Sequence, residues 1–380
     1  MHNATPCSLD WIVAARRPRD PSSSARELRV VDLFSGCGGM TLGVVEGARL
    51  NTVKAKVVLA VDLNAQALEV FSTNFKVKSP IVRNKKVEDV FNGRDNRKCT
   101  LEELALKDDI GSVDIVVAGP PCQGHSSLNN STRRDDPRNE LYLTLVRAAK
   151  VLEPKVMIIE NVPDVVNCHS QVVQRCERSL RKLGYKTSMG KISLTELGLP
   201  QCRNRHLLIA ARMQKVEFSY VSSSYATEVS AIGEYIGDIM DECRQKQGLF
   251  YEASTASKEN KKRIRYLFRK RLYDLPNSQR PPCHRDKKHT YKSMYGRLKW
   301  DEPAQTITSG FGCMGQGRYV HTYRERTLTP HEAARIQGLP DFFDFGTVKT
   351  LTALRKIIAN AVPPRLTAVF VDYLLRQGIL

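Results

Sequence analysis

The sequence predicts an open α/β fold with a parallel sheet, and three segments carry the prediction. Residues 28–34 form an apolar strand that runs through a glycine turn, 35–39, into a helix over 40–48. A second apolar strand, 56–63, ends in an acid and an amide and is followed by another helix. A third, 113–118, consists mostly of β-branched or small residues, which is typical of a strand buried in a parallel sheet.

The composition limits the class of protein. The chain has 380 residues, a formal net charge of +19 and ten cysteines, with a pI near 9.6. Its length allows a full core and two domains, and its charge favours a polyanionic partner, nucleic acid before membrane. No two cysteines form a C-x-x-C pair, so we expect reduced thiols and no disulfides.

The chain carries no sequence signal for a membrane or for export. No apolar run approaches the about 18 residues of a membrane span, and the N-terminus lacks an apolar signal core. We expect a soluble intracellular monomer without membrane contact, cytoplasmic and nucleoid-associated in a bacterium or nuclear in a eukaryote. Residues 1–26, rich in Ser, Pro, Arg and Asp, are expected to be a poorly ordered extension.

The glycine turn and the acids that follow it indicate a ligand site. Glycines before a helix let the backbone pass close to a ligand, although a lone turn of this kind is as often a plain tight turn. Asp62 ends the second strand about two dozen residues later, where an acid commonly binds ribose hydroxyls. Asn64 is expected to cap a helix through Phe75. After a short strand near 81–82, Asp89 is either an acceptor for an exocyclic amine or a plain loop acid.

A proline pair followed by a cysteine ends the third apolar strand. Pro120 and Pro121 fix φ and remove amide donors, and Cys122 should stand at the carboxyl edge of the sheet, where open α/β sheets bind ligands. Cys122 is a candidate nucleophile, and the alternative is an inert buried cysteine. The loop 123–140 has no periodic apolar face, and three of its residues suit phosphate contacts: Arg133, Arg134 and Arg138.

Charged residues also mark the next two strands. Glu160 lies near the end of the apolar strand 156–162, beside the strand of Cys122 if the strands run in chain order. It is either a proton donor or a carboxylate that caps the next helix. Arg203 and Arg205 precede the strand 206–211 and, two residues apart in an extended segment, should point the same way and form one cationic wall.

Five sequence blocks occur in a fixed order. They are D-L-F-S-G-C-G-G (32–39), G-P-P-C-Q (119–123), E-N-V (160–162), Q-C-R-N-R (201–205) and A-N-A-V-P-P (359–364). Together they resemble the C5-cytosine DNA methyltransferase family, in its stand-alone bacterial form, over residues 28–211 and 296–364. Two positions depart from the family's pattern, because Ala359 replaces its usual glycine and Asp62 stands where Glu is more common.

The resemblance implies S-adenosylmethionine as methyl donor. It also implies a doubly wound, Rossmann-like methyltransferase sheet with a smaller target-recognition domain. The residues that would line the cofactor are Phe34, Gly36, Gly38, Gly39, Asp62, Asp89, Pro120 and Asn360. Among these, Asp62 would bind the ribose, Asp89 the adenine and Asn360 the methionine end.

The resemblance further implies a covalent mechanism on a specific sequence of double-stranded DNA. Cys122 would attack cytosine C6, which makes C5 nucleophilic enough to accept a methyl group. Glu160 would donate to N3 and the exocyclic amine, Arg205 would hold O2, and Arg203 would orient Glu160 or a phosphate. The target base must first leave the stacked duplex, and the loop 123–140 would close over it.

The pattern of the family lapses in the middle of the chain, which sets the expected domains. Residues 27–211 and 345–380 would form the catalytic, cofactor-binding domain, and 212–344 the target-recognition domain. Within the latter, 258–273 holds eight basic residues among aromatics and suits phosphate contacts, unless it is merely a solvated basic helix. Residues 364–380 should form a final helix that returns to the first domain.

Other residues of the second domain are expected to be structural. Cys283, His284 and His289 lack a fourth ligand, so a polar loop is favoured over a metal site. Arg297 is expected to pack the domain together rather than read a base. A helix should begin at Thr329 as cap, with Pro330 in its first turn.

Three alternatives remain at the level of sequence. The branch of the family that acts on tRNA carries a Cys-Phe-Thr tripeptide, which is absent here, so duplex DNA is favoured. A catalytically silent homologue would be expected to lose Cys122 or the glycine turn, and both are present. A nucleotide-binding oxidoreductase would not account for the Cys, Glu and Arg set. The DNA sequence recognised, and any pairing with a restriction enzyme, stay open.

Overall fold

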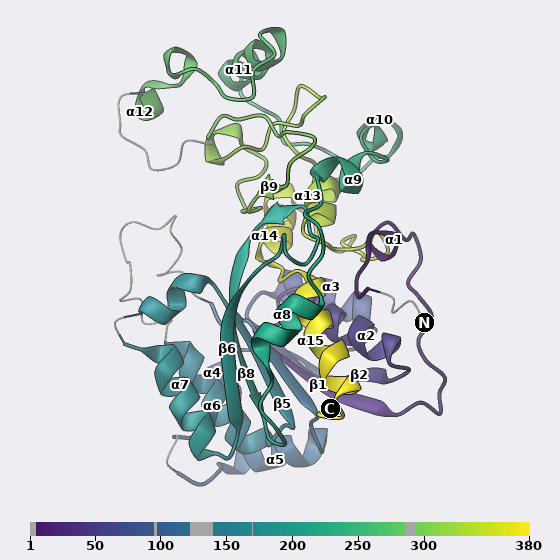
Figure 1. Ribbon diagram of the computed structural model, residues 1–380, viewed down its shortest axis with the longest axis vertical. Helices are drawn as coiled ribbons and strands as arrows, with labels where there is room; N and C mark the ends of the chain where they lie inside the picture. Colours follow the sequence, from purple (N-terminus) through teal and green to yellow (C-terminus); the bar gives the residue numbers. More distant parts are fainter. Residues whose placement is uncertain (1–4, 95–96, 122–139, 169, 286–293) are drawn as a thin grey trace.

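A seven-stranded sheet forms the centre of the computed structural model, which describes residues 5–94, 97–121, 140–168, 170–285 and 294–380 (Figure 1). The strand order is β3-β2-β1-β4-β5-β8-β6. β1 to β5 are parallel, and β8 lies antiparallel between β5 and β6. The strands are β1 (Glu27–Leu33), β2 (Lys54–Asp62), β3 (Val82–Asn84), β4 (Ile115–Ala118), β5 (Val156–Asn161), β6 (Lys186–Ser193) and β8 (Asn204–Ala211).

Helices cover both faces of this sheet. One face carries α2 (Gly39–Leu50), α3 (Ala65–Phe75), α8 (Phe218–Ser224) and α15 (Pro364–Arg376), and the other carries α4 (Val87–Val90), α5 (Leu101–Ile110), α6 (Leu141–Leu152) and α7 (Val172–Lys182). Successive strand residues divide between two cores, as Val30 and Val31 do. The predicted doubly wound α/β fold is confirmed. Among the described residues, no helix combines the length and apolar character needed to cross a membrane.

Local hydrogen bonds explain where several helices begin. Asn64 caps α3 as predicted, because its Oδ1 accepts from Ala67 N at 3.2 Å. Thr329 begins α13 (Pro330–Ile336) with a capping box completed by Glu332, which confirms the start expected there. In each case the sequence signal lies within one helical turn, so no tertiary contact is needed to place it.

A stripe of three glycines lets α2 lie directly on the C-terminal segment. Gly39, Gly43 and Gly47 are four residues apart and share one face of the helix. A methyl group on Gly39 or Gly43 would overlap the carbonyl oxygen of Val362 or Pro364, and one on Gly47 would lie 2.7 Å from that of Ala368. The final helix therefore returns to the first domain, as predicted, and packs at backbone distance.

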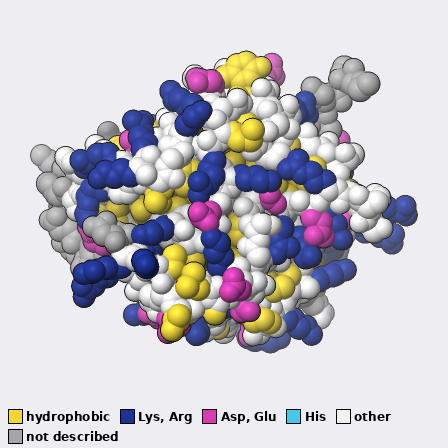
Figure 2. Space-filling model, turned by 90° about the horizontal axis from the view of Figure 1, so that it is seen from below, with side chains coloured by type: hydrophobic (Ala, Val, Ile, Leu, Met, Phe, Trp, Pro, Cys, Tyr) yellow, Lys and Arg dark blue, Asp and Glu magenta, His cyan; other side chains and the backbone are white. Residues whose placement is uncertain are grey.

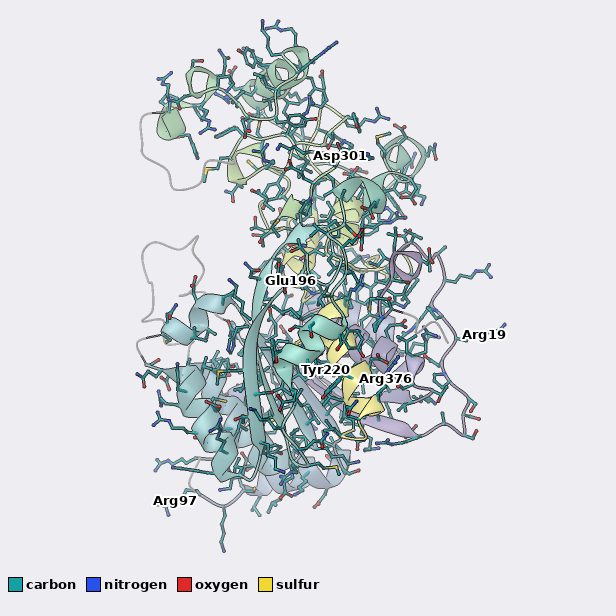
Figure 3. The ribbon with its side chains drawn as sticks, in the orientation of Figure 1. Arg19, Arg97, Glu196, Tyr220, Asp301 and Arg376 are labelled. Carbon is teal, nitrogen blue, oxygen red and sulfur yellow. The ribbon has the colours of Figure 1, made fainter. Side chains whose placement is uncertain are left out.

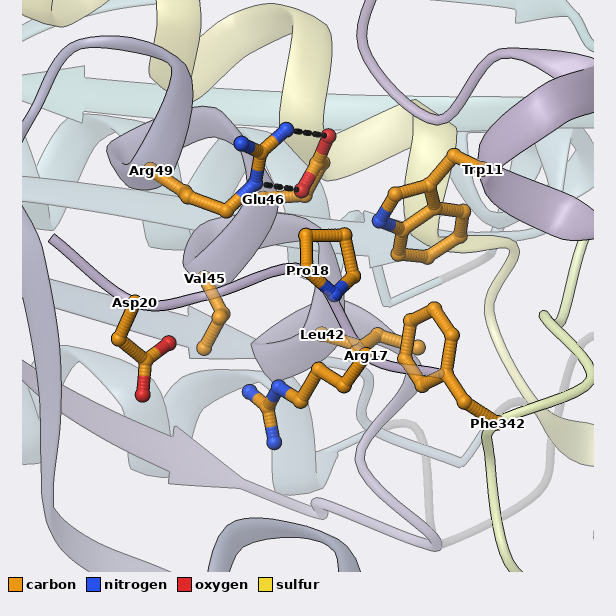
Figure 4. A pocket seen from close by; sticks show the side chains of 9 residues that line it. All are labelled: Trp11, Arg17, Pro18, Asp20, Leu42, Val45, Glu46, Arg49 and Phe342. Atoms are coloured by element: carbon orange, nitrogen blue, oxygen red, sulfur yellow. Dashed lines mark hydrogen bonds and ion pairs between the residues drawn. The ribbon is translucent and has the colours of Figure 1, made fainter. Parts of the chain in front are cut away.

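The N-terminal segment packs onto the body of the protein over its described residues, 5–26, instead of forming the expected poorly ordered extension. Its short helix α1 (Leu9–Ile12) buries Trp11 and Ile12 in the main core. The rings of Trp11 and Phe342 meet edge-on with centroids 5.3 Å apart. Figure 4 shows the residues around a small pocket under this segment, namely Trp11, Arg17, Pro18, Asp20, Leu42, Val45, Glu46, Arg49 and Phe342. The burial of a few apolar side chains is enough to order this segment, although most of its residues are polar.

A second, smaller part of the chain lies beyond the carboxyl ends of the parallel strands (Figure 1). Side chains of α11, with Tyr295, Met314 and Val320, form a separate small core there. Figure 3 labels Asp301 within this part and Arg97 at the far end of the sheet. The elements of this part are α9 (Ile232–Ile236), α10 (Glu242–Gln245), α11 (Lys258–Arg269), α12 (Pro282–Arg285), β9 (Ala304–Gln305) and α13, after which α14 (Leu351–Asn360) leads back.

Two contacts define how the second part joins the sheet. The strand β7 (Gln201–Cys202) pairs in parallel with β9, so a two-stranded ribbon connects the two parts. α8 follows the expected domain boundary after residue 211, yet it packs on the sheet layer, with the rings of Phe218 and Phe370 5.3 Å apart. α8 thus belongs to the sheet layer of the structure, because it packs against α15 and β6.

Asp32 is buried near the end of β1, directly below the glycine turn. Only 1% of the residue is exposed, and Thr41 Oγ1 of α2 donates to its Oδ2 at 2.6 Å. Burial raises the pKa of this carboxyl to about 7, and the charge of Asp62 adds to the increase. Asp32 therefore titrates near neutrality in the folded protein.

Replacement of Gly43 by alanine is expected to lower the free energy of unfolding by about 1–3 kcal/mol, because the methyl group must push α15 away. Urea unfolding followed by circular dichroism measures the change. Gly346→Ala is the control, since its new Cβ would meet only the exposed Asp344 side chain, at 3.0 Å. Equal losses in the two variants would contradict the close helix packing.

Asp32→Asn is expected to change how stability depends on pH. Between pH 4 and about 7 the folded wild type keeps a proton on Asp32 that the unfolded chain has released, so its stability falls as pH rises. The asparagine does not titrate and can still accept from Thr41, so the variant lacks this decline. Thermal unfolding measured from pH 4 to 8 compares the two proteins, and parallel curves would contradict the assignment.

Candidate active site

The glycine turn leaves open space beside Gly36. Gly36 has a φ of +54°, and a Cβ built there would have no heavy atom within 4 Å. Phe34, just before it, has a φ of 58°. Asp62 braces the turn, because its Oδ2 accepts from Gly36 N at 2.8 Å and its Oδ1 from Asn64 N at 2.7 Å. The structure thus brings Phe34, Gly36 and Asp62 together at the ends of β1 and β2.

The other two glycines of the turn serve packing. Gly38 has a φ of +95°, and a Cβ there would lie 2.8 Å from the Phe71 ring, while Gly39 lies against the Val362 carbonyl. Neither position has the open surroundings of Gly36. The geometry therefore separates one glycine that borders open space from two that allow α2 to approach α3 and the C-terminal block.

The surroundings of the turn fit the cofactor that the sequence resemblance implies. Gly38 is the N-cap of α2 and has no side chain to accept from its first turn, so amides of that turn remain available to acceptor atoms of a ligand. Ser35 Oγ is buried without a hydrogen-bond partner in the described ranges. Asp89 is exposed in α4, and Asn360 is exposed at the end of α14. Open space, donors and acceptors suit a polar nucleoside with an amino-acid end.

The segment Gly119–Pro120 is held in place by an amide that the sequence did not mark as functional. Asn161 is buried at the end of β5, and its Nδ2 donates to Pro120 O at 3.3 Å. Its Oδ1 accepts from Val162 N at 2.8 Å, which fixes the orientation of the amide. Pro120 is itself buried. Cys122 and the loop arginines 133, 134 and 138 lie outside the described residues.

Glu160 and Arg205 form a buried ion pair at this edge. β4 and β5 are neighbours, as predicted, and β8 pairs antiparallel with β5, so Arg205 near the start of β8 reaches the end of β5. Arg205 Nε lies 2.5 Å from Glu160 Oε1, with the two side chains 11% and 9% exposed. A Cβ on Gly119 would be 3.7 Å from Glu160 Oε2. Burial lowers the pKa of Arg205, while the Glu160 charge opposes that shift.

Arg203 turns away from this pair into the junction between the two parts of the chain. It is 4% exposed, and its guanidinium donates to backbone oxygens of Ile307 at 3.5 Å, Ala359 at 3.2 Å and Ala361 at 3.5 Å. Burial lowers its pKa well below the ordinary value, and the charge of Arg205 adds to this. The expected single cationic wall is therefore not formed, because the two arginines hold different partners.

Two buried glutamines complete the junction and were missed from the sequence. Gln201 and Gln337 are both 0% exposed, and Gln201 Nε2 donates to Gln337 Oε1 at 2.7 Å. Amides are common on protein surfaces, so their type gives no signal of burial. Only their positions in the sequence could have indicated a role, since Gln201 is the first residue of the Q-C-R-N-R block and Gln337 is the C-cap of α13.

No group of three or more potential metal ligands is found among the described residues. Cys283 Sγ and His284 Nδ1 are 3.1 Å apart on the exposed helix α12, and His289 lies outside the described ranges.

Comparison with known proteins gives relatives over almost the whole chain. The sequence model of the C-5 cytosine-specific DNA methylase family matches residues 28–374. Type II methyltransferase M1.BsuMI of Bacillus subtilis is 40% identical over 366 residues, covering 96% of this chain and 84% of the relative. Type II methyltransferase M1.HphI of Haemophilus parahaemolyticus is 28% identical, covering 92% and 87%.

Solved structures share the fold. The S. pombe Dnmt2 methyltransferase has a TM-score of 0.61 at 18% identity, covering 93% of this chain and 99% of its own. The Entamoeba histolytica methyltransferase EhMeth has a TM-score of 0.62 at 18% identity, with the same coverage. Since the family model spans nearly all of the chain, this protein belongs to the C-5 cytosine-specific DNA methylase family, enzymes that methylate C5 of cytosine in DNA with S-adenosylmethionine.

Proposed function

We propose that this enzyme methylates a flipped-out cytosine within a specific duplex DNA sequence, through a covalent bond between Cys122 and cytosine C6. The observation that carries the proposal is the buried Glu160–Arg205 pair beside Gly119. A carboxyl group and a guanidinium at the edge that leads to a cysteine are what activation of a cytosine ring requires. Arg203 supports the site from the junction rather than by touching the base.

The proposed chemistry assigns each residue a step. Cys122, as thiolate, adds to C6 while Glu160 gives a proton to N3, and Arg205 donates to O2, where charge develops. S-adenosylmethionine supplies the methyl group that C5 then accepts. A base then removes the C5 proton, the electron pair of that bond forms the C5=C6 double bond, and Cys122 leaves C6 as thiolate while N3 returns its proton to Glu160. Because C6 is stacked inside a duplex, the base must be flipped out first.

The cofactor would be held by the residues around the glycine turn. We assign its ribose hydroxyls to Asp62, whose oxygens each accept one backbone bond and have lone pairs left for another. Phe34 and Asp89 would face the adenine, and Pro120 would border the pocket. Asn360 would bind the amino-acid end, since it is exposed and its block packs on Gly39.

Residues 226–344 would read the DNA, with α8 assigned to the catalytic part. α11 supports this, because Ile264 and Leu267 are buried while most of its basic side chains are exposed and suit phosphates. Arg297 lies between the rings of Phe268 and Tyr273, 4.7 Å from each centroid, which supports the expected structural role. Figure 2 shows Lys and Arg also spread over the opposite end, so net charge alone does not locate the DNA. We further propose that the enzyme acts as a monomer.

Transfer of labelled methyl from S-adenosylmethionine tests the proposal. We expect label on duplex DNA, and a stable protein adduct on duplex containing 5-fluorocytosine, because the C5 fluorine cannot leave as a proton does. Cys122→Ser should lose both, and Glu160→Gln should slow transfer by about 10²-fold or more. Label on bulk tRNA alone would move the substrate to RNA, and tight DNA binding without any transfer would contradict the enzymatic mechanism.

Asn161→Asp should slow the attack step. Aspartate keeps the acceptor for Val162 N but turns a second oxygen toward Pro120 O, which repels the segment that carries Cys122. We expect adduct formation on 5-fluorocytosine DNA to slow by about tenfold or more, normalised to folded protein. Asn92→Asp is the control, since Asn92 is exposed and its Oδ1 accepts from Thr100 Oγ1, a role aspartate retains. Unchanged adduct kinetics in Asn161→Asp would show that Asn161 does not position the loop.

A further inference from the structure

Three polar side chains meet at the junction of the sheet with the second part of the chain. They are Gln201 of β7, Arg203 between β7 and β8, and Gln337 at the C-terminus of α13, and they are 0%, 4% and 0% exposed. Buried polar groups at this depth are costly unless their hydrogen bonds are made. The partners they take therefore determine how the surrounding segments are placed.

Gln201 ties the junction to the second part of the chain. Its Oε1 accepts from Ile307 N at 2.9 Å. Its Nε2 donates to Ile336 O at 3.2 Å and to Gln337 Oε1 at 2.7 Å. These bonds orient the Gln337 amide, because an oxygen that accepts from Gln201 leaves only the nitrogen to face the opposite side.

That nitrogen faces the end of α14. Gln337 Nε2 donates to Ile358 O at 2.9 Å and to Ala359 O at 3.2 Å. Arg203 adds bonds to Ala359 O and to Ala361 O. The backbone is thus held on both sides of Asn360, whose own side chain is exposed.

The same block is fixed from the cofactor side. The carbonyl of Val362 lies against Gly39, and Val362 Cγ2 would be 3.9 Å from a Cβ on Gly119. The backbone around Asn360 is therefore held on one side by the glycine turn and on the other by the buried junction. A shift at either support would move its amide relative to the open space at Gly36.

We propose that Gln337 is a positioning residue for cofactor binding, acting through the carbonyls next to Asn360. This rests on the proposed contact between Asn360 and the amino-acid end of S-adenosylmethionine. Gln337 touches neither cofactor nor DNA; it fixes the angle at which the Asn360 amide is presented. Its loss appears as weakened cofactor binding, with a smaller effect on turnover at saturation.

Gln337→Glu is the most informative variant, because it removes only the hydrogen bonds that Gln337 donates to the end of α14. A glutamate oxygen still accepts from Gln201 and Arg203, whereas its second oxygen repels the carbonyls of Ile358 and Ala359. Gln337→Met, similar in size and uncharged, removes the same donor without a charge. Gln377→Glu makes the matched change at an exposed residue after α15 and serves as control.

Calorimetry with S-adenosylhomocysteine and the full-length enzyme measures binding without turnover. We expect the dissociation constant to rise about tenfold in Gln337→Glu and Gln337→Met. The KM for S-adenosylmethionine should rise similarly, while kcat and the affinity for duplex DNA change less than threefold. The control should match wild type, and thermal unfolding shows that each variant is folded. Unchanged cofactor affinity in both Gln337 variants, or equal losses of cofactor and DNA affinity, would overturn the inference.

A double-mutant cycle with Asn360→Ala separates this inference from the assignment of Asn360. If Gln337 acts through Asn360, the double variant should bind S-adenosylhomocysteine about as weakly as Asn360→Ala alone. Additive losses would overturn the positioning role. Wild-type affinity in Asn360→Ala would instead overturn the proposed cofactor contact itself. Weak binding in Asn360→Ala with normal binding in both Gln337 variants would leave that contact standing and remove only the inference.

Discussion

The guanidinium of Arg203 is buried where the sheet, the second part of the chain and the C-terminal block meet. Burying a cation costs free energy unless oxygens surround it. Here the oxygens are backbone carbonyls of Ile307, Ala359 and Ala361 and the amide of Gln337, all distant from Arg203 in sequence. Satisfying one charge therefore fixes three segments against one another, including the backbone on both sides of Asn360.

A second constraint places the charged pair at the edge of the sheet. β8 runs opposite to its neighbour β5, so its first residues lie beside the last residues of β5. This reversal brings Arg205 to Glu160, and the parallel pairing of β4 with β5 brings both beside Gly119. On the other side, the glycines of α2 admit the C-terminal block at backbone distance. The ion pair and the contact between α2 and the C-terminal block thus lie at the same carboxyl edge of the sheet.

Local sequence patterns predict the fold and the position of Glu160 at the edge of the sheet. Strand 113–118, the cap at Asn64 and the adjacency of the Glu160 strand were predictable, since periodicity and capping act within a few residues. The direction of Arg203 was not, because residues 201–202 belong to β7 and the next strand starts at 204, so alternation along one strand does not apply. The burial of Trp11 was likewise hidden, since its partner Phe342 is far along the chain.

The sequence by itself determined the α/β class, the order of the five blocks and the candidate groups for the chemistry, because these depend on residue type and local spacing. Only the tertiary structure decided which of them meet. In the folded protein Gly36 borders open space, whereas Gly38 and Gly39 pack against other segments. Arg203 and Arg205 bind different partners. Three further amide side chains take part in the hydrogen bonds around the site, those of Asn161, Gln201 and Gln337. The reason is that a buried amide or cation takes its role from the oxygens around it, and those come from segments that only folding brings together.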